Sequence, residues 1–199
     1  MAGADVFRFD HAERDLAFRP IDATGNGAAL SLAQLKRYDE QGFLSPLPGL
    51  EPAEADDLRQ YMDWLVSEVV SAEDRRNGYS INNYHRVCRR LHDLISTPRF
   101  VDYATDILGS EAVCWSMHAF CKLPGDGMEV PLHQDANYWP FTPTKSVTVW
   151  LAVDDVDDDN SAMHFVPGSH LAGDLDHTEV PLDGSVVLNR RVVDHDQFA

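Results

Sequence analysis

Apolar and polar positions in the first hundred residues recur at helical spacing. Ser31 is suited to cap a helix over about residues 32–41, and Gly42 ends it. After a proline-rich extended stretch, a second helix opens near Pro52, because proline fits the first turn of a helix. Its buried face is predicted from six residues at helical spacing: Leu58, Tyr61, Met62, Leu65, Val69 and Val70.

Two more helices are predicted before the pattern changes. They cover roughly residues 85–95 and 98–108, and Gly109 ends the second. Beyond it come short runs rich in β-branched and aromatic residues, broken by Pro, Gly or Asp clusters, as in strands. The predicted strands are 112–121, 129–134, 146–153 and 162–166. Helices followed by strands indicate an α+β fold that is mainly β.

The domain organisation is simple. Residues 1–28 carry scattered charges without clear periodicity, so we interpret them as a loosely ordered N-terminal arm. Residues 29–199 form one domain, as the length allows. The acidic run at 154–159 lacks the Gly and the distant Glu of an EF-hand, so we expect a solvated turn between strands rather than a calcium loop.

The composition limits the kinds of binding partner that the protein can have. The formal net charge of −17 argues against nucleic acid or an anionic membrane, which require a basic surface. A small anionic substrate in a local basic pocket stays open. No apolar run approaches the roughly 20 residues of a membrane helix, and the N-terminus lacks the pattern of a secretory signal. Three cysteines, an odd number, favour reduced thiols and a cytoplasmic location. A monomer and a homodimer are both compatible with the sequence.

One spacing points to a metal. His133 and Asp135 are two residues apart, so on an extended strand their side chains point to the same face while Gln134 turns away. An imidazole and a carboxylate that converge in this way make two-thirds of a 2-His-1-carboxylate facial triad, the usual site for non-haem Fe(II). The pair is therefore a candidate iron site that needs a further histidine.

A familiar order of motifs surrounds this pair, in the segments 115–127, 130–135, 138–140, 147–155 and 166–170. The chain resembles the phytanoyl-CoA dioxygenase family of Fe(II)/2-oxoglutarate-dependent oxygenases, in particular its bacterial members that hydroxylate small metabolites. A lone His-x-Asp arises often by chance, whereas several ordered motifs at natural spacing do not. The resemblance spans about residues 30–198.

The resemblance implies a double-stranded β-helix (jelly-roll) core with the N-terminal helices packed on one side. It also implies Fe(II), with 2-oxoglutarate and O2 as cosubstrates, and hydroxylation of an unactivated C–H bond coupled to decarboxylation of 2-oxoglutarate to succinate. The substrate would be a small metabolite, either a natural-product intermediate or an organophosphonate. Related halogenases have a small residue in place of the carboxylate, so Asp135 favours hydroxylation over halogenation.

The resemblance also assigns cosubstrate contacts. Lys122 matches a family position that contacts 2-oxoglutarate, and a Lys in an apolar run is costly unless it is paired. Trp150 matches an aromatic residue that walls the cosubstrate pocket, and Met117 is a similar wall candidate. Solvent exposure of Lys122 and simple core packing of Trp150 and Met117 are the alternatives.

Substrate contacts are predicted from two regions. Asn83 and His85 resemble a family motif at the mouth of the active site, with surface turn chemistry as the alternative. Tyr138 and Trp139 follow the metal pair closely enough to shape a substrate pocket, or to be core. Arg89 lies at helical spacing from Arg86 and Arg90, a cluster that would hold an anionic substrate or form a solvated face paired with acids such as Asp93.

The third iron ligand is the open question. Downstream of Asp135 the histidines are His164, His170, His177 and His195. None of them follows the Gly-containing turn and apolar strand that precede the family's distal histidine. His195 is the remaining candidate for a substitute iron ligand. We therefore expect the third His, an Arg for 2-oxoglutarate and the last strands beyond Ala199, and weak iron binding and slow turnover from these residues alone. The rival readings are a non-catalytic or degenerate jelly-roll binding protein and a zinc enzyme on a cupin-like scaffold.

Overall fold

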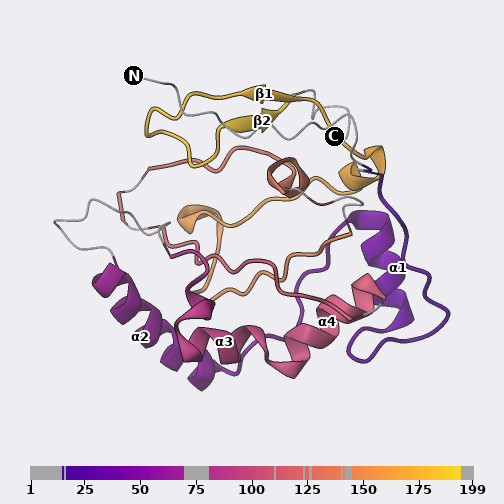
Figure 1. The fold of residues 1–199 in the computed structure, drawn as a ribbon, viewed down its shortest axis with the longest axis horizontal. Helices are drawn as coiled ribbons and strands as arrows, with labels where there is room; N and C mark the ends of the chain where they lie inside the picture. Colours follow the sequence, from indigo (N-terminus) through magenta and orange to yellow (C-terminus); the bar gives the residue numbers. More distant parts are fainter. Residues whose placement is uncertain are drawn as a thin grey trace.

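The computed structural model describes residues 15, 17–69, 81–109, 111–122, 124–125, 127–139, 141 and 145–193. Helices gather along one side of the molecule, a two-stranded ladder lies at the opposite side, and extended segments run between them (Figure 1). The elements in order are α1 (Leu32–Gln41), α2 (Pro52–Val69), α3 (Arg89–Ile95), α4 (Pro98–Leu108), β1 (His177–Glu179) and β2 (Arg190–Val192). None of the described helices is both long and apolar enough to cross a membrane.

Helix α1 has the predicted bounds, and its ends show why. The Ser31 side chain accepts a hydrogen bond from the Gln34 backbone N–H, while the Gln34 side chain accepts one from the Ser31 N–H. This reciprocal capping box satisfies two of the backbone donors that a helix start leaves open. At the other end Gly42 takes a left-handed conformation with φ of 85°. The predicted helix over 32–41 is therefore confirmed.

The other helices are confirmed with one correction. Helix α4 begins at Pro98 and is ended by the left-handed Gly109, and α2 begins at Pro52, as predicted. The continuous helix expected over 85–95 is wrong. A 3₁₀ turn covers Tyr84–Arg86, and α3 begins only at Arg89. The physical reason is the start of the turn: Asn83 has φ of 60° and donates its backbone N–H to the Met117 carbonyl, which fixes a turn rather than a helix.

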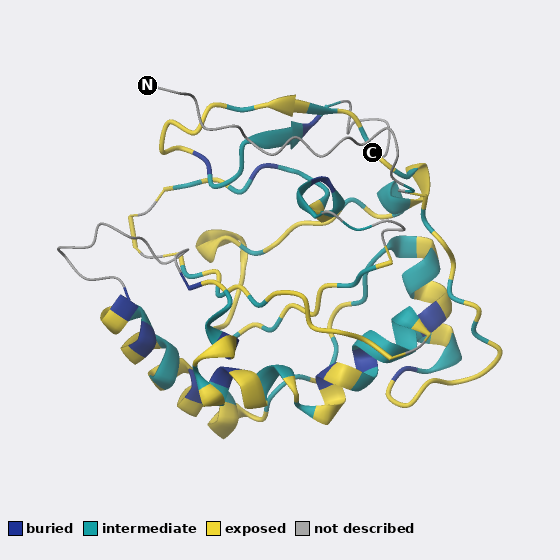
Figure 2. Ribbon diagram, in the orientation of Figure 1, coloured by how far each residue is buried: buried dark blue, intermediate teal, exposed yellow. Residues whose placement is uncertain are grey.

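Two apolar clusters form the buried parts of the helical side (Figure 2). The first joins α1 and α4 through Leu35, Phe100 and Tyr103, together with Leu30. The second joins α2 and α3 and consists of Leu65, Val69, Ile81 and Leu91. Of the six residues predicted for the buried face of α2, Leu58, Leu65 and Val69 are buried and Tyr61 and Met62 are half-buried. Val70 lies outside the described residues.

A turn in the C-terminal half closes the end of α1. The Gly168 N–H donates to the Gln41 carbonyl at 3.0 Å, and His170 Nε2 lies 2.8 Å from the Asp39 carbonyl. Both carbonyls lie in the last turn of the helix, where backbone acceptors have no partner within the helix. The turn at residues 166–170 therefore joins the helical side to the rest of the molecule, and this contact occupies His170.

The β part matches the α+β class but is less regular than expected. The described residues form one antiparallel ladder, in which His177 faces Val192, and two isolated bridges, Asn82 with His118 and Glu129 with Val186. The runs predicted as strands at 112–121, 129–134, 146–153 and 162–166 are extended segments, and none is a regular strand over its described residues. About half of each of the side chains Trp115, Phe120, Trp150 and Phe165 is exposed. These residues do not show the double-stranded β-helix, which stays an expectation.

The described part of the N-terminal arm makes specific contacts. Ile21 and Ala23 pack against the first apolar cluster, and the Ala28 N–H donates to the Asp106 carboxylate at 2.7 Å. Residues 1–14 and 16 lie outside the described residues, so the boundary predicted at residue 28 stays a prediction. In the acidic run, Asp157 accepts backbone hydrogen bonds from Asp159 and Asn160 in an exposed turn.

Candidate metal centre

The backbone that carries the metal pair is held beside β2. The Glu129 N–H donates to the Ser185 carbonyl at 2.9 Å, and the Val192 N–H donates to the Leu132 carbonyl at 2.8 Å. His133 follows directly on this anchored stretch. The chain stays extended through Gln134, and Asp135 then begins a 3₁₀ turn that ends at Tyr138. The predicted common face of residues 133 and 135 therefore arises where an extended segment enters a turn.

The two predicted ligand side chains converge. His133 Nε2 lies 3.1 Å from Asp135 Oδ1. Two donor atoms that bind one ion at right angles, each at about 2.1 Å, lie about 3 Å apart. The His133 side chain is mostly buried at 22% exposure, whereas Asp135 is about half exposed at 48%. The pair therefore has the separation of a chelate that a cation can reach from solvent.

The other ring nitrogen of His133 has the partner that a metal ligand needs. Nδ1 lies 2.7 Å from the carbonyl of the buried Pro131, so an Nδ1–H donor leaves the Nε2 lone pair directed at the site. Burial acts to lower the pKa of His133, but the hydrogen bonds with Asp135 and the Pro131 carbonyl raise it above its ordinary value of 6.5. In the protonated form that this raised pKa favours, Nε2 also carries a proton, and a metal ion at Nε2 would have to displace it.

The surroundings of the pair come from two further segments. Thr148 Oγ1 donates to Asp135 Oδ2 at 3.3 Å, which leaves Oδ1 facing His133. The Tyr138 ring meets the His133 ring edge-on, with 5.9 Å between the ring centres, and burial raises the pKa of Tyr138. The Trp139 ring lies 5.9 Å from the Phe141 ring. Tyr138 thus borders the metal pair as predicted for a pocket residue, and its contact with substrate stays a prediction.

Sequence reasoning missed the segment 173–177. The Gln134 side chain donates to the Gly173 carbonyl and accepts from the Leu175 N–H, both at 2.8 Å, and the Gln134 N–H donates to His177 Nε2 at 3.3 Å. Burial lowers the pKa of His177, which keeps an acceptor on the ring. The Gln134 amide bonds backbone groups, which require no particular residue type, so the sequence carries no signal for those two contacts.

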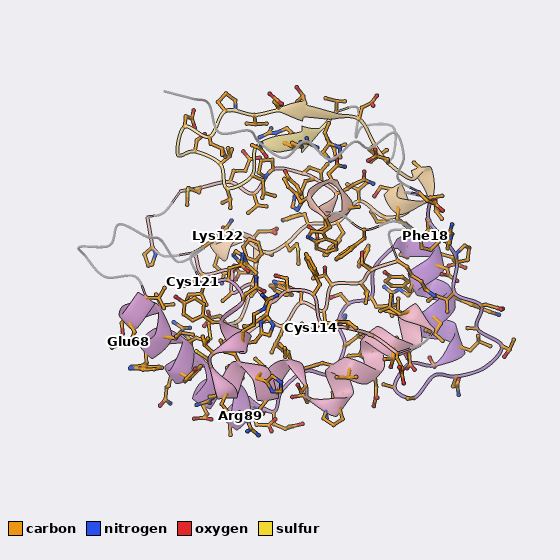
Figure 3. All side chains as sticks on the ribbon, viewed as in Figure 1. Phe18, Glu68, Arg89, Cys114, Cys121 and Lys122 are labelled. Carbon is orange, nitrogen blue, oxygen red and sulfur yellow. The ribbon has the colours of Figure 1, made fainter. Side chains whose placement is uncertain are left out.

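The three predicted cosubstrate residues have different surroundings in the structure. Met117 packs against the second apolar cluster, which is the core alternative for this residue, and a pocket-wall role stays a prediction. Lys122 is exposed and lies among the extended segments (Figure 3). Trp150 is 47% exposed and lies two residues after Thr148 on the segment that reaches Asp135. Trp150 therefore shares an extended segment with Thr148, which contacts Asp135, and its role at the cosubstrate pocket stays a prediction.

Two of the three predicted substrate residues on the helical side, Asn83 and Arg89, have hydrogen-bond or ion-pair partners in the structure. The Asn83 side chain accepts from the Met117 N–H at 3.4 Å. His85 is buried, its Nδ1 has no hydrogen-bond partner within the described residues, and burial lowers its pKa. Arg89 lies on the outer side of the helices (Figure 3) and pairs with Asp93 at 2.7 Å. This pairing is the surface alternative for Arg89, and a substrate contact stays a prediction.

A third ligand is not found where the structure describes the chain. Among those residues no group of three or more His, Cys, Asp or Glu side chains is placed to hold a metal ion. His164 pairs with Asp158 at 3.1 Å, and His170 is held at α1. His195 lies outside the described residues. The described residues therefore offer two of the three protein ligands that the predicted triad needs.

Comparison with known proteins assigns the family. The sequence profile for phytanoyl-CoA dioxygenase (PhyH) matches residues 38–186. L-proline trans-4-hydroxylase from Streptomyces griseoviridis is 29% identical over 157 residues, which are 73% of this chain and 57% of that protein. Peroxisomal phytanoyl-CoA dioxygenase from Bos taurus is 24% identical over 195 residues, 87% of this chain and 58% of that protein. No solved structure matches the chain significantly.

A further relative is named for hypophosphite. A probable alpha-ketoglutarate-dependent hypophosphite dioxygenase from Stutzerimonas stutzeri is 28% identical over 113 residues, 54% of this chain and 39% of that protein. The chain belongs to the phytanoyl-CoA dioxygenase family. It spans somewhat more than half the length of the first two relatives.

Proposed function

We propose that this chain contributes the iron-binding pair of an Fe(II)/2-oxoglutarate-dependent hydroxylase that acts on a small metabolite. The observation that supports this most directly is the 3.1 Å separation of His133 Nε2 from Asp135 Oδ1, with the remaining polar atom of each side chain held by another group. Paired imidazole and carboxylate ligands suit ferrous iron in oxygenases of this type. The family assignment supports the same chemistry.

Bound iron, with 2-oxoglutarate and O2 as cosubstrates, would supply the oxidising power, so that a C–H bond becomes C–OH while the oxoacid is converted to succinate and CO2. The side chains bind and orient. His133 and Asp135 hold the metal, the Pro131 carbonyl fixes the tautomer of His133, and Thr148 fixes the free oxygen of Asp135. No side chain needs to act as a general base.

The cosubstrate and substrate contacts extend this proposal. Lys122 would pair with a carboxylate of 2-oxoglutarate, while Trp150 and Met117 would form walls of its pocket. Tyr138 and Trp139, which follow the metal pair, would border the substrate, and Asn83 and His85 would lie at the mouth. One relative is named as an L-proline hydroxylase and another as a probable hypophosphite dioxygenase, and both names support a small substrate. A cytoplasmic location, expected from the cysteine content, is part of the proposal.

Metal binding by matched variants tests the core of the proposal. Mn(II) is a suitable probe, because it shares a preference for carboxylate and imidazole donors and its free ion gives an EPR signal that is lost on binding. We expect the chain to reduce the free Mn(II) signal, and His133→Ala and Asp135→Ala to abolish this effect. Succinate formation from 2-oxoglutarate, stimulated by a small metabolite, would then establish the reaction. Equal Mn(II) binding by the chain and both variants would exclude the site.

A further inference from the structure

Gln134 stands between the two metal-ligand residues and is tied to a different part of the chain. Its side-chain amide donates to the Gly173 carbonyl and accepts from the Leu175 N–H, each at 2.8 Å. One donor meets an acceptor and one acceptor meets a donor, so the orientation of the amide is determined by its partners. Gly173 has φ of 73° and ψ of −136°, a conformation that glycine adopts readily and other residues avoid.

The backbone of Gln134 is held by a second side chain. Its N–H donates to His177 Nε2 at 3.3 Å, and His177 Nδ1 lies 2.7 Å from the Leu175 carbonyl. The carbonyl requires Nδ1 to carry the proton, so Nε2 is the acceptor for Gln134. His133 repeats the arrangement, because its Nδ1 meets the carbonyl two residues before it. His177 Nε2 therefore accepts a hydrogen bond from the backbone N–H of Gln134, between the two proposed metal ligands, rather than binding a metal itself.

The other side of His133 is held by the same ladder. β1 and β2 are antiparallel, and His177 of β1 faces Val192 of β2. The Val192 N–H donates to the Leu132 carbonyl at 2.8 Å, one residue before His133. The β1–β2 ladder therefore anchors the backbone before His133 through Val192, and the backbone after it through His177.

We propose that Gln134 and His177 are positioning residues that set the separation of the two metal-ligand atoms. The inference rests on the proposed function. In a His-x-Asp pair, the relative placement of the two side chains depends on the backbone torsions at and beside the middle residue. Three hydrogen bonds, two from the Gln134 amide and one from its N–H, restrain those torsions from outside the metal site. Ligand groups must be held to within about 0.5 Å of the productive geometry to bind metal well.

Substitutions that keep size separate this role from simple packing. Gln134→Leu removes both amide hydrogen bonds, and His177→Leu removes the acceptor for the Gln134 N–H. His177→Gln is the conservative variant, because a glutamine oxygen can accept at the position of Nε2. We expect each leucine variant to weaken Mn(II) binding by about tenfold, as loss of partners outside the metal shell commonly does, and the glutamine variant to stay within about threefold of the parent.

Asp174→Ala is the matched control. It removes the 3.0 Å hydrogen bond from Asn137 Nδ2 to Asp174 Oδ1, which joins the same two segments without involving Gln134 or His177. We expect this control to lower the thermal midpoint of the metal-free protein and to leave the Mn(II) dissociation constant unchanged. If Gln134→Leu does not fold, His177→Leu compared with His177→Gln decides alone.

Each outcome has one meaning. Parent-like Mn(II) binding by the leucine variants would overturn the positioning role. The proposed function would stay intact in that case if His133→Ala still abolished Mn(II) binding. A loss of affinity in Asp174→Ala equal to that in the leucine variants would also overturn it, because the effect would then be general coupling of the two segments. Absence of Mn(II) binding by the parent chain would remove the proposed function, and this inference with it.

Discussion

Thr148 donates a hydrogen bond to Oδ2 of Asp135 at 3.3 Å, while Oδ1 of the same carboxylate lies 3.1 Å from the His133 ring. The two carboxylate oxygens therefore have different partners. A carboxylate held in this way presents one oxygen to a metal and keeps the other engaged with the protein. Thr148 lies on the extended segment that also carries Trp150, so this segment fixes the orientation of the Asp135 carboxylate.

Thr148→Val tests that role, because valine keeps the shape and removes the hydroxyl. We expect the Mn(II) dissociation constant to rise, by up to about tenfold, since contacts that orient a ligand contribute to metal affinity. Thr148→Ser keeps the hydroxyl and should bind Mn(II) as the parent does. A valine variant with unchanged affinity would show that Asp135 is oriented without Thr148.

Asp106 holds the entry to α1 through backbone hydrogen bonds. Its carboxylate accepts from the N–H groups of Ala28, Ala29 and Leu30 at 2.7–2.8 Å. A Cβ atom at Gly27 would lie within 2.3 Å of this carboxylate, so the loop can close only with glycine there. Although burial acts to raise it, these three hydrogen bonds lower the pKa of Asp106 below its ordinary value.

A carboxyl group with a lowered pKa in the folded state stabilises the fold above its unfolded pKa, and this stabilisation is lost as the pH falls through the folded pKa. We expect Asp106→Asn to lower the free energy of unfolding by about 1–3 kcal/mol at neutral pH, because hydrogen bonds to a charged group are strong. Urea unfolding at several pH values measures this. The difference between the parent and the variant should shrink only as the pH falls below the ordinary value of 3.8 and through the lowered folded pKa, and a pH-independent difference would contradict the assignment.

Two glycines provide a matched test of the contact between α1 and the turn at 166–170. Gly42 and Gly109 both end helices with positive φ, of 85° and 70°. A Cβ atom at Gly42 would lie 2.6 Å from His170 Nδ1, whereas one at Gly109 would meet nothing within 4 Å. Gly109→Ala should therefore cost about 1–2 kcal/mol from backbone conformation alone.

Gly42→Ala should cost about 1 kcal/mol more than Gly109→Ala, because the methyl group displaces the His170 ring. Thermal or urea unfolding of both variants measures the difference. In a His170→Ala background the excess should disappear, which assigns it to this contact. Equal costs for the two glycine variants would mean that the ring moves aside freely.

Local rules predicted the helices well. The ends of α1 and α4 are set by the side chains or the backbone freedom of single residues: Ser31 with Gln34, Gly42, Pro98 and Gly109. Residues that are neighbours in sequence therefore determine where these helices begin and end. The convergence of His133 and Asp135 was predictable for the same reason, since they lie two residues apart. Such features need only a few consecutive residues.

Features that depend on distant partners were not predictable. The break before α3 depends on Asn83 meeting Met117, and the restraint of Gln134 depends on His177, which lies 43 residues further along the chain. The regular strands expected at 112–121 and 146–153 need hydrogen-bonded neighbours that alternation of residues cannot specify. Pairing partners are a property of the fold rather than of the segment.

The ion pair of Arg89 with Asp93 gives a last prediction that bears on substrate binding. Both side chains are largely exposed, at 87% and 54%, and the hydrogen bond from Arg89 lowers the pKa of Asp93. In Arg89→Ala we expect the pKa of Asp93 to rise towards its ordinary value, as NMR titration would show. An unchanged KM for substrate would assign Arg89 to the surface, where the guanidinium group already has a partner. A clear rise in KM would instead show that Arg89 binds the substrate.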